Sequence, residues 1–313
     1  MATMQAVRFH SYGAPEVLVL EEVPRPQAGT GEVLIRVHAA GVNPIDWKVR
    51  AGHVKEWLQH RLPLIPGWDV SGVVEAVGPG VTAFKTGDAV FCMLDFLHNG
   101  AYAEYVAART RDLARRPRSI DHVQAAAVPL AALTAWQSLF EVAGLAPWHT
   151  VLIHAAAGGV GHFAVQFAKW KGAKVIGTAS AGNKVFLLEL GADAVIDYQT
   201  TRFEEVASEV DVVLDPIGGD TQGRSWQVLK QGGILVATLG VSSQEIARQH
   251  GVRGEGVGVH PDSGQLTQIA ALIDAGDLKP AVTTVLPLAE AARAHELSQT
   301  GHVRGKIVLK VGD

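Results

Sequence analysis

Cysteine is almost absent from this chain of 313 residues, which contains Cys92 and no second cysteine. A single thiol cannot form a disulfide within the chain, and it cannot build a zinc lobe that requires four cysteines. Because Cys92 lies in the apolar run of residues 89–94, we predict a buried thiol that contributes packing rather than chemistry.

An excess of charge and an uninterrupted hydrophobic run are also lacking. The 27 basic and 31 acidic residues give a formal net charge of −4, so nothing in the charge favours nucleic acid or an anionic membrane as a partner. The longest apolar tract, residues 124–146, is interrupted by Pro129, Gln137 and Glu141 and is a poor membrane span. Residues 1–11 lack the apolar core of a signal peptide, so we expect a cytoplasmic protein without a membrane partner.

The most informative motif that is present follows a short apolar run at residues 151–153. Ala156-x-Gly158-x-x-Gly161 reads as the dinucleotide fingerprint G-x-G-x-x-G with alanine in the first place. Gly158 would let the backbone approach a pyrophosphate, Gly161 would let the helix pack closely on the strand, and the helix N-terminus would face the phosphates. A helical pattern and a second apolar strand follow, as the motif requires. The predicted cofactor loop is Ala156, Gly158, Gly159, Val160 and Gly161.

The residues after the second strand indicate which dinucleotide is bound. NAD sites usually carry an acidic residue about 20 positions after the first glycine, to hold the ribose 2′-hydroxyl. Residues 176–180 contain no acid, whereas Ser180, Asn183 and Lys184 offer a hydroxyl, an amide and a positive charge that suit a 2′-phosphate. The alternative is a solvated helix start capped by Ser180 or Asn183. We predict NADPH rather than NADH as the cofactor.

The rest of the chain divides into a part with short strands and a part in which strands and helices alternate. Residues 32–38 and 70–77 read as short strands between Gly- and Pro-rich turns, which is typical of a compact antiparallel β domain. The alternation further on predicts a parallel sheet covered on both faces. Strands are expected at 151–153, 174–178, 194–197, 211–215, 233–239 and 305–311, and helices at 125–142, 162–171, 183–190, 203–209, 220–229 and 289–300.

The predicted fold class is therefore α/β, a doubly wound Rossmann sheet joined to a mostly antiparallel β domain. We place the dinucleotide-binding domain at residues 123–270. The β domain would comprise residues 1–122 and 271–313, with the active cleft between the two domains.

Segments along almost the whole chain resemble one known superfamily. The matching segments are residues 40–46, 66–74, 77–81, 87–90, 100–105, 133–135 and 304–308. With the fingerprint, they identify the chain as similar to the zinc-free quinone oxidoreductase branch of the medium-chain dehydrogenase/reductase superfamily, whose β domain is GroES-like.

Two departures from the zinc alcohol dehydrogenases bear on the chemistry. By resemblance, those relatives have a cysteine ligand where this chain has Asn43, and His-Glu where it has Trp68 and Asp69. Catalytic zinc needs about three protein ligands, so we predict no metal site. Without a Lewis acid, the site suits acceptors that already delocalise the incoming charge, such as quinones and α,β-unsaturated carbonyls.

The resemblance also implies roles for individual residues. Asn43 would line the nicotinamide end of the cleft and donate to the acceptor oxygen, or alternatively cap the turn before Pro44. Thr134 would contact the nicotinamide carboxamide or pack within its helix. Tyr198 would lie near the adenosine phosphate. Asp46, Trp47 and Trp68 are assigned to the substrate pocket, Asp46 holding its neighbours in place, and Leu239 and Gly240 to a cofactor-binding strand end.

The leading hypothesis is an NADPH:quinone oxidoreductase that transfers hydride directly to a small-molecule quinone. One alternative is an alkenal or enone reductase of the same fold, and a more remote one is a nucleotide-binding protein without catalysis. The resemblance further implies a homodimer, for which residues 256–260 are the candidate edge segment.

Overall fold

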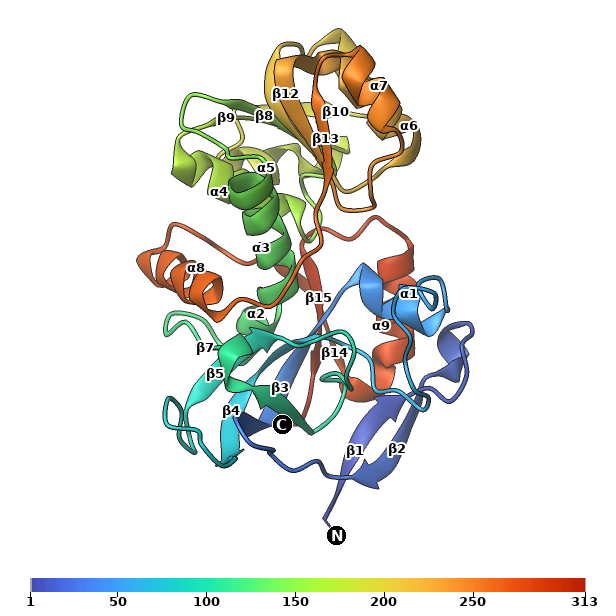
Figure 1. Ribbon diagram of the computed structural model, residues 1–313, viewed down its shortest axis with the longest axis vertical. Coiled ribbons are helices and arrows are strands. Elements are labelled where there is room, and N and C mark those ends of the chain that lie inside the picture. Colours follow the sequence, from blue (N-terminus) through green and yellow to red (C-terminus); the bar gives the residue numbers. More distant parts are fainter. Residues whose placement is uncertain (1, 313) are drawn as a thin grey trace. The chain divides into compact units, whose positions relative to one another are not determined.

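The computed structural model describes residues 2–312 and separates into two compact units (Figure 1). One unit comprises residues 1–133 together with 260–313, and the other comprises residues 134–259. The domain boundaries at 122/123 and 270/271 stay a prediction. No helix within residues 2–312 is long and apolar enough to cross a membrane.

The unit of residues 134–259 is built on a parallel six-stranded sheet, which confirms the predicted Rossmann architecture. Its strand order is β10-β9-β8-β11-β12-β13. The chain runs outward from β8 through β9 to β10, then returns to place β11 on the other side of β8. A doubly wound sheet binds its ligands outside the carboxyl ends of the strands at such a reversal. The strands are β8 (Thr150–Ile153), β9 (Lys174–Ala179), β10 (Ala194–Asp197), β11 (Val210–Asp215), β12 (Leu229–Ala237) and β13 (Arg253–Gly256).

Buried apolar side chains explain why these segments form a covered parallel sheet. Every residue of β11 is buried, as are Val151, Leu152 and Ile153 of β8. Phe163 and Phe167 are buried on α4, and Gly172 ends that helix with φ 88°. The helices of this unit are the C-terminal part of α3 (Pro129–Trp136), α4 (Gly161–Lys171), α5 (Lys184–Glu189), α6 (Gly219–Ser225) and α7 (Gln244–Gln249).

The other unit contains a mostly antiparallel seven-stranded sheet, as predicted for the β domain. Long strand β3 pairs with β4 on one side, and on the other with β6 near its start and β15 near its end. The C-terminal strand thus returns to the N-terminal sheet (Figure 1). The sheet strands are β3 (Glu32–Val42), β4 (Asp69–Val77), β5 (Ala89–Met93), β6 (Tyr105–Arg109), β7 (Leu113–Arg115), β14 (Val282–Pro287) and β15 (Lys306–Lys310), and β1 (Thr3–Arg8) pairs with β2 (Val19–Pro24) separately.

Several predicted elements are wrong in extent. The helix expected at residues 125–142 is broken into α2 (His122–Ala126), α3 and a π-helix (Gln137–Val142), since Pro129 lacks the N–H needed to continue α2. Residues 203–209 form a single 3₁₀ turn, Phe203–Glu205, rather than a helix. The sheet edge is β13, so most of the candidate segment 256–260 lies beyond the strand. Helix α8 (Ser263–Ala275) was not predicted. Together with α1 (Pro44–Arg50), α2 and α9 (Ala291–Gln299), it belongs to the unit that contains the antiparallel sheet.

Acid should destabilise the fold partly through His295 on α9. The ring is fully buried, neither ring nitrogen has a partner among the described residues, and Tyr102 packs edge-on to it at 5.7 Å. Burial, with a smaller effect of the Arg50 charge, lowers the pKa of His295 from 6.5 to about 3. Between these values the unfolded chain binds a proton that the folded protein does not, so this contribution to stability is present above pH 6.5 and is lost as the pH falls.

The difference in the free energy of unfolding between His295→Phe and wild type should therefore depend on pH. It should favour the variant by about 2 kcal/mol more at pH 5 than at pH 8. Other titrating groups are common to both proteins and cancel in the comparison. Urea unfolding of both proteins at the two pH values measures the difference. An equal effect of the substitution at pH 5 and pH 8 would show that His295 is not kept neutral by the fold.

Candidate cofactor and active site

The turn after β8 packs tightly against the start of α4. Ala155 adopts φ 45°, a left-handed conformation that is strained for a residue with a Cβ. A Cβ added at Gly161 would lie 2.3 Å from the Ala155 carbonyl oxygen and 2.6 Å from the Ala156 Cα, so only glycine fits there. This close approach of α4 to the end of β8 is the packing role predicted for the third glycine of the fingerprint.

Part of this turn, at the start of α4, is accessible to solvent. Gly158, Gly159 and Val160 are partly exposed, and Ala156 is buried with its N–H donating to the Thr178 carbonyl at 3.0 Å. Val160 is the N-cap residue and makes no side-chain hydrogen bond to the helix. An N-terminus of this kind presents backbone N–H groups and positive dipole to an anion. The loop therefore fits the diphosphate of a nicotinamide dinucleotide.

Ser180 and Lys184 line one cavity of about 410 Å³, next to the ends of β9 and β10. Asp197 lines the same cavity, so a basic, a hydroxyl and an acidic side chain face one space. Tyr198 is half exposed and is absent from the lining, although its N–H bonds the Ala179 carbonyl at 3.2 Å. Of the residues predicted for the adenosine end of the cofactor, the structure places Ser180 and Lys184 on this cavity, but not Asn183 or Tyr198. It adds the Asp197 carboxylate, which the sequence did not predict there.

The other predicted cofactor contacts are dispersed over the unit of residues 134–259. Leu239 is 54% exposed in the segment after β12, where a strand end of an open α/β sheet meets its ligand. Gly240, with φ 86°, accepts a hydrogen bond at its carbonyl from Gln222 Nε2 at 3.1 Å. Thr134 is buried on α3. Their roles in cofactor binding stay predictions.

Asn43 lies at the start of α1, where its backbone and side chain join a buried polar network. Its N–H donates to Asp46 Oδ2 at 2.8 Å, which stabilises the first turn of the helix. Its side-chain Nδ2 donates to Asp69 Oδ2 at 2.8 Å, and Lys306 Nζ donates to its Oδ1. The Tyr102 hydroxyl donates to Asp46 at 2.9 Å. Asp69 and Lys306 therefore bond Asn43 directly, and Tyr102 joins the network through Asp46.

Burial dominates the electrostatics of this network. It raises the pKa of Asp46 to about 7, against the opposing effect of the hydrogen bonds from Asn43 and Tyr102. It raises the pKa of Asp69 and lowers that of Lys306, and the attraction between these two groups partly offsets both shifts. Their charged atoms, Nζ and Oδ2, are 3.5 Å apart. Asn43 bonds both Lys306 and Asp69. Because its amide is neutral, it adds no buried charge that a further charged group would have to compensate.

The two predicted pocket tryptophans lie in different surroundings. Trp68 is fully buried, donates from Nε1 to the His98 carbonyl at 3.1 Å and packs edge-on against Phe96 at 5.5 Å. Trp47 is partly buried, and its Nε1 has no acceptor among the described residues. The structure thus joins Asn43 to Asp46 directly, while assignment of Asp46, Trp47 and Trp68 to a substrate pocket stays a prediction.

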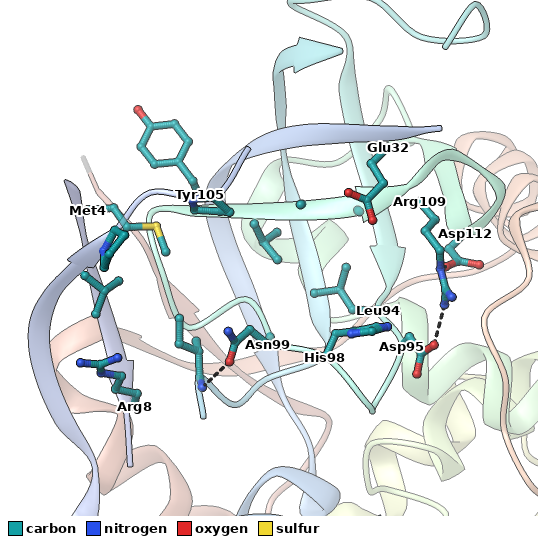
Figure 2. Close-up of a pocket in the computed structure, with 18 of the residues that line it drawn as sticks. Met4, Arg8, Glu32, Leu94, Asp95, His98, Asn99, Tyr105, Arg109 and Asp112 are labelled. Atoms are coloured by element: carbon teal, nitrogen blue, oxygen red, sulfur yellow. Dashed lines mark hydrogen bonds and ion pairs between the residues drawn. The ribbon is translucent and has the colours of Figure 1, made fainter. Parts of the chain in front are cut away.

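A second cavity of about 400 Å³ lies in the unit that contains the N-terminal sheet (Figure 2). Its walls include Leu94 and Asp95 from the loop after β5, and Asp95 accepts from Arg109 at 2.7 Å. The sequence also favours residues 93–97 as a candidate wall of the substrate pocket, and Leu94 and Asp95 belong to this run. Asn43, Asp46, Trp47 and Trp68 do not line the cavity.

Sequence reasoning missed Asp69, Tyr102 and Lys306 as partners of the Asn43 region. All three lie in segments that matched the superfamily, but local sequence does not reveal which strands bring them together. Cys92 is buried on β5, and burial raises the pKa of its thiol well above the usual value. Within residues 2–312, no three His, Cys, Asp or Glu side chains are grouped as metal ligands would be.

Comparisons with known proteins cover nearly the whole chain. Residues 29–118 match the alcohol dehydrogenase GroES-like domain family, and residues 190–309 match the family described as zinc-binding dehydrogenase. The quinone oxidoreductase of Rattus norvegicus is 33% identical over 98% of this chain and 97% of its own. The 2-methylene-furan-3-one reductase of Solanum lycopersicum is 34% identical over 98% of this chain and 79% of its own. The structure of the quinone oxidoreductase from Coxiella burnetii covers 99% of this chain and 100% of its own, with TM-score 0.92 and 38% identity.

Proposed function

This chain belongs to the quinone oxidoreductase branch of the medium-chain dehydrogenase/reductase superfamily, and from that membership we propose that it reduces quinones with NADPH, without zinc. Membership of this family shows an oxidoreductase that uses a nicotinamide cofactor. The proposed use of NADPH, of quinones and of a site without zinc rests on the chemistry of particular residues. The observation that supports it most directly is the Asn43 amide, an uncharged hydrogen-bond donor where, by resemblance, the zinc relatives have a cysteine ligand.

A neutral donor is sufficient for an acceptor that spreads negative charge over a conjugated system. A reduced nicotinamide, when bound, would supply the hydride, and the quinone that accepts it would carry negative charge on an oxygen. One Nδ2 hydrogen of Asn43 bonds Asp69, and the second has no acceptor among the described residues. We propose that this second hydrogen bonds the acceptor oxygen and stabilises the developing charge. Asp46, held by Tyr102, keeps the turn in place and moves no proton.

NADPH specificity is supported by the residues that line the cavity beside β9 and β10. Ser180 and Lys184 offer a hydroxyl and a positive charge to a 2′-phosphate. The Asp197 carboxylate in the same cavity opposes that phosphate, so the balance of these two charges sets the preference between NADPH and NADH.

An enone reductase is the alternative, and the similarity to a 2-methylene-furan-3-one reductase favours it. Steady-state assays with a naphthoquinone and a 2-alkenal, each with NADPH and with NADH, separate the candidates by loss of reduced-cofactor absorbance. We expect a higher kcat/KM for the naphthoquinone with NADPH, unchanged by EDTA. A higher kcat/KM for the alkenal would favour the alternative, and activity lost together with about one zinc ion per chain would overturn the zinc-free assignment.

Removing the Lys184 charge should weaken NADPH binding by about 1–3 kcal/mol and leave NADH binding almost unchanged, because only NADPH carries the 2′-phosphate. Titration of both cofactors into Lys184→Ala, followed by nicotinamide fluorescence, measures this difference. Asp197→Asn provides the matched opposite change in the same cavity and should tighten NADPH selectively. Equal weakening of NADPH and NADH by Lys184→Ala would show that the 2′-phosphate lies elsewhere.

The homodimer and the cytoplasmic location are also proposals. The exposed edge of β13 is a strand that a second copy could cover, continuing the sheet across a two-fold axis. Light scattering of the purified protein should give twice the chain mass of 33.2 kDa.

A further inference from the structure

Lys306 is a buried lysine for which neither the sequence nor the proposed mechanism has supplied a role. It is 2% exposed at the start of β15. Its ammonium donates to the Val42 carbonyl at 3.0 Å and to Asn43 Oδ1, and Asp69 Oδ2 lies 3.5 Å away. These three acceptors match the three hydrogens of the group. A lysine with all its donors engaged has no hydrogen left for a substrate, so its function is exerted on these neighbours.

The strand register explains how Lys306 reaches Asn43. β15 runs antiparallel to β3, with Ile307 opposite Val42, so the next residue in each direction places Lys306 opposite Asn43. Gly305 precedes it with φ 59°, and a Cβ there would lie 2.3 Å from the Ala281 carbonyl oxygen. Only glycine permits this close contact between the backbone at residue 305 and Ala281. The contact therefore fixes the position from which the Lys306 side chain reaches the buried network.

The charges on either side of Asn43 determine which way its amide points. Lys306 can only donate and the Asp69 carboxylate can only accept, so the amide oxygen must face Lys306 and the NH₂ group must face Asp69. The flipped amide would set its NH₂ against the ammonium and its oxygen against the carboxylate. It would lose two charge-assisted hydrogen bonds and gain two repulsive contacts. The Lys306 charge at Oδ1 also polarises the amide and strengthens its N–H groups as donors.

We propose that Lys306 is a positioning residue that holds the Asn43 amide with its NH₂ group as the donor for the acceptor oxygen. This rests on the proposed role of Asn43 in stabilising the reduced acceptor. Lys306 touches neither cofactor nor substrate in this account, and it acts through the orientation and polarity of one amide. The competing explanation is that Lys306 only neutralises the buried carboxylates and supports the fold.

A double-mutant cycle separates the two explanations. Lys306→Met should lower kcat at least roughly tenfold, with the NADPH dissociation constant unchanged. The same substitution in an Asn43→Ala background should cause little further loss, because the group through which Lys306 acts is gone. An equal fractional loss of kcat in both backgrounds would overturn the proposal.

Adding Asp69→Asn to Lys306→Met keeps the test valid if the single variant folds poorly. This double substitution removes both buried charges and should restore thermal stability, yet it leaves the Asn43 amide without a fixed orientation. We expect kcat to remain low while the melting temperature recovers. Recovery of kcat together with stability would show that the lysine serves only to balance charge.

The orientation of the Asn43 amide can be measured by NMR without catalytic turnover. This measurement tests the role of Lys306 independently of the proposed function. In protein labelled with ¹⁵N-asparagine, the Asn43 side-chain NH₂ signals are identified by their loss in Asn43→Ala. Lys306→Met should move these signals and accelerate their exchange with solvent. Unchanged signals would overturn the positioning role, whatever the activity. Full turnover of Asn43→Ala would instead overturn the catalytic role of Asn43, and the NMR result would still report whether Lys306 orients the amide.

Discussion

Replacing Asn43 by alanine is expected to lower kcat for quinone reduction roughly 10- to 1000-fold, the range observed when one donor to a developing oxyanion is removed. The reason is that this amide is the neutral group proposed to stabilise charge on the acceptor oxygen. NADPH affinity should remain nearly unchanged, because the residues predicted to hold the dinucleotide lie in residues 134–259, on the parallel sheet. Steady-state kinetics and a cofactor titration of the same preparation measure both quantities.

Two controls separate lost chemistry from lost folding in this experiment. Lys306 and Asp69 are 3.5 Å apart in the wild-type structure, so we expect these two buried charges to compensate each other when the amide is removed, and the thermal transition of Asn43→Ala shows whether that is sufficient. Cys92→Ser changes a buried thiol on β5, which pairs with β4, and should leave kcat within about a factor of three, since that thiol contributes packing only. A fully active Asn43→Ala protein would place the chemistry on another residue.

The parts of the fold that the sequence predicts are those with a strong local signal. Alternating apolar strands and helices predict the parallel sheet, and the glycine spacing at 156–161 predicts a turn that the structure shows to be sterically closed to any Cβ at Gly161. Helix α8 was missed although its ends carry recognisable caps. The Asp262 side chain accepts from the Gln265 N–H at 2.8 Å, and Gly276 ends the helix with φ 84°. These two caps are the local sequence signal that predicts this helix.

The candidate site could be predicted only in part, because its polar network is assembled by long-range pairing. Asn43 and Lys306 are 263 positions apart, and only the antiparallel register of β3 with β15 brings them together. No periodicity or spacing encodes that contact. Similarly, Asp197 enters the Ser180–Lys184 cavity from the next parallel strand. The first βαβ unit alone therefore predicts the positive charge of this cavity and not the negative one.

Substituting Gly161 by alanine, which adds a single methyl group, is expected to abolish most cofactor binding. The added methyl group would overlap the Ala155 carbonyl oxygen and the Ala156 Cα, which are backbone atoms and cannot rotate away. α4 must then shift from the end of β8, at a cost of about 1–3 kcal/mol in folding stability, as for other overpacked sites. The shift would carry the first N–H groups of the helix away from the diphosphate position, and we expect the NADPH dissociation constant to rise at least roughly tenfold.

Gly223→Ala on α6 is the matched control for this substitution. A Cβ at Gly223 meets nothing within 4 Å, and the residue is exposed and helical, so alanine there should be neutral or stabilise the protein by about 0.5–1 kcal/mol. Calorimetry of NADPH binding and thermal unfolding of both variants give the comparison. If Gly161→Ala bound NADPH as wild type does, while unfolding at a lower temperature, the turn would be a packing element only. The diphosphate would then have to be sought at another strand end, since the close contact of α4 with β8 would be needed for folding and not for the ligand.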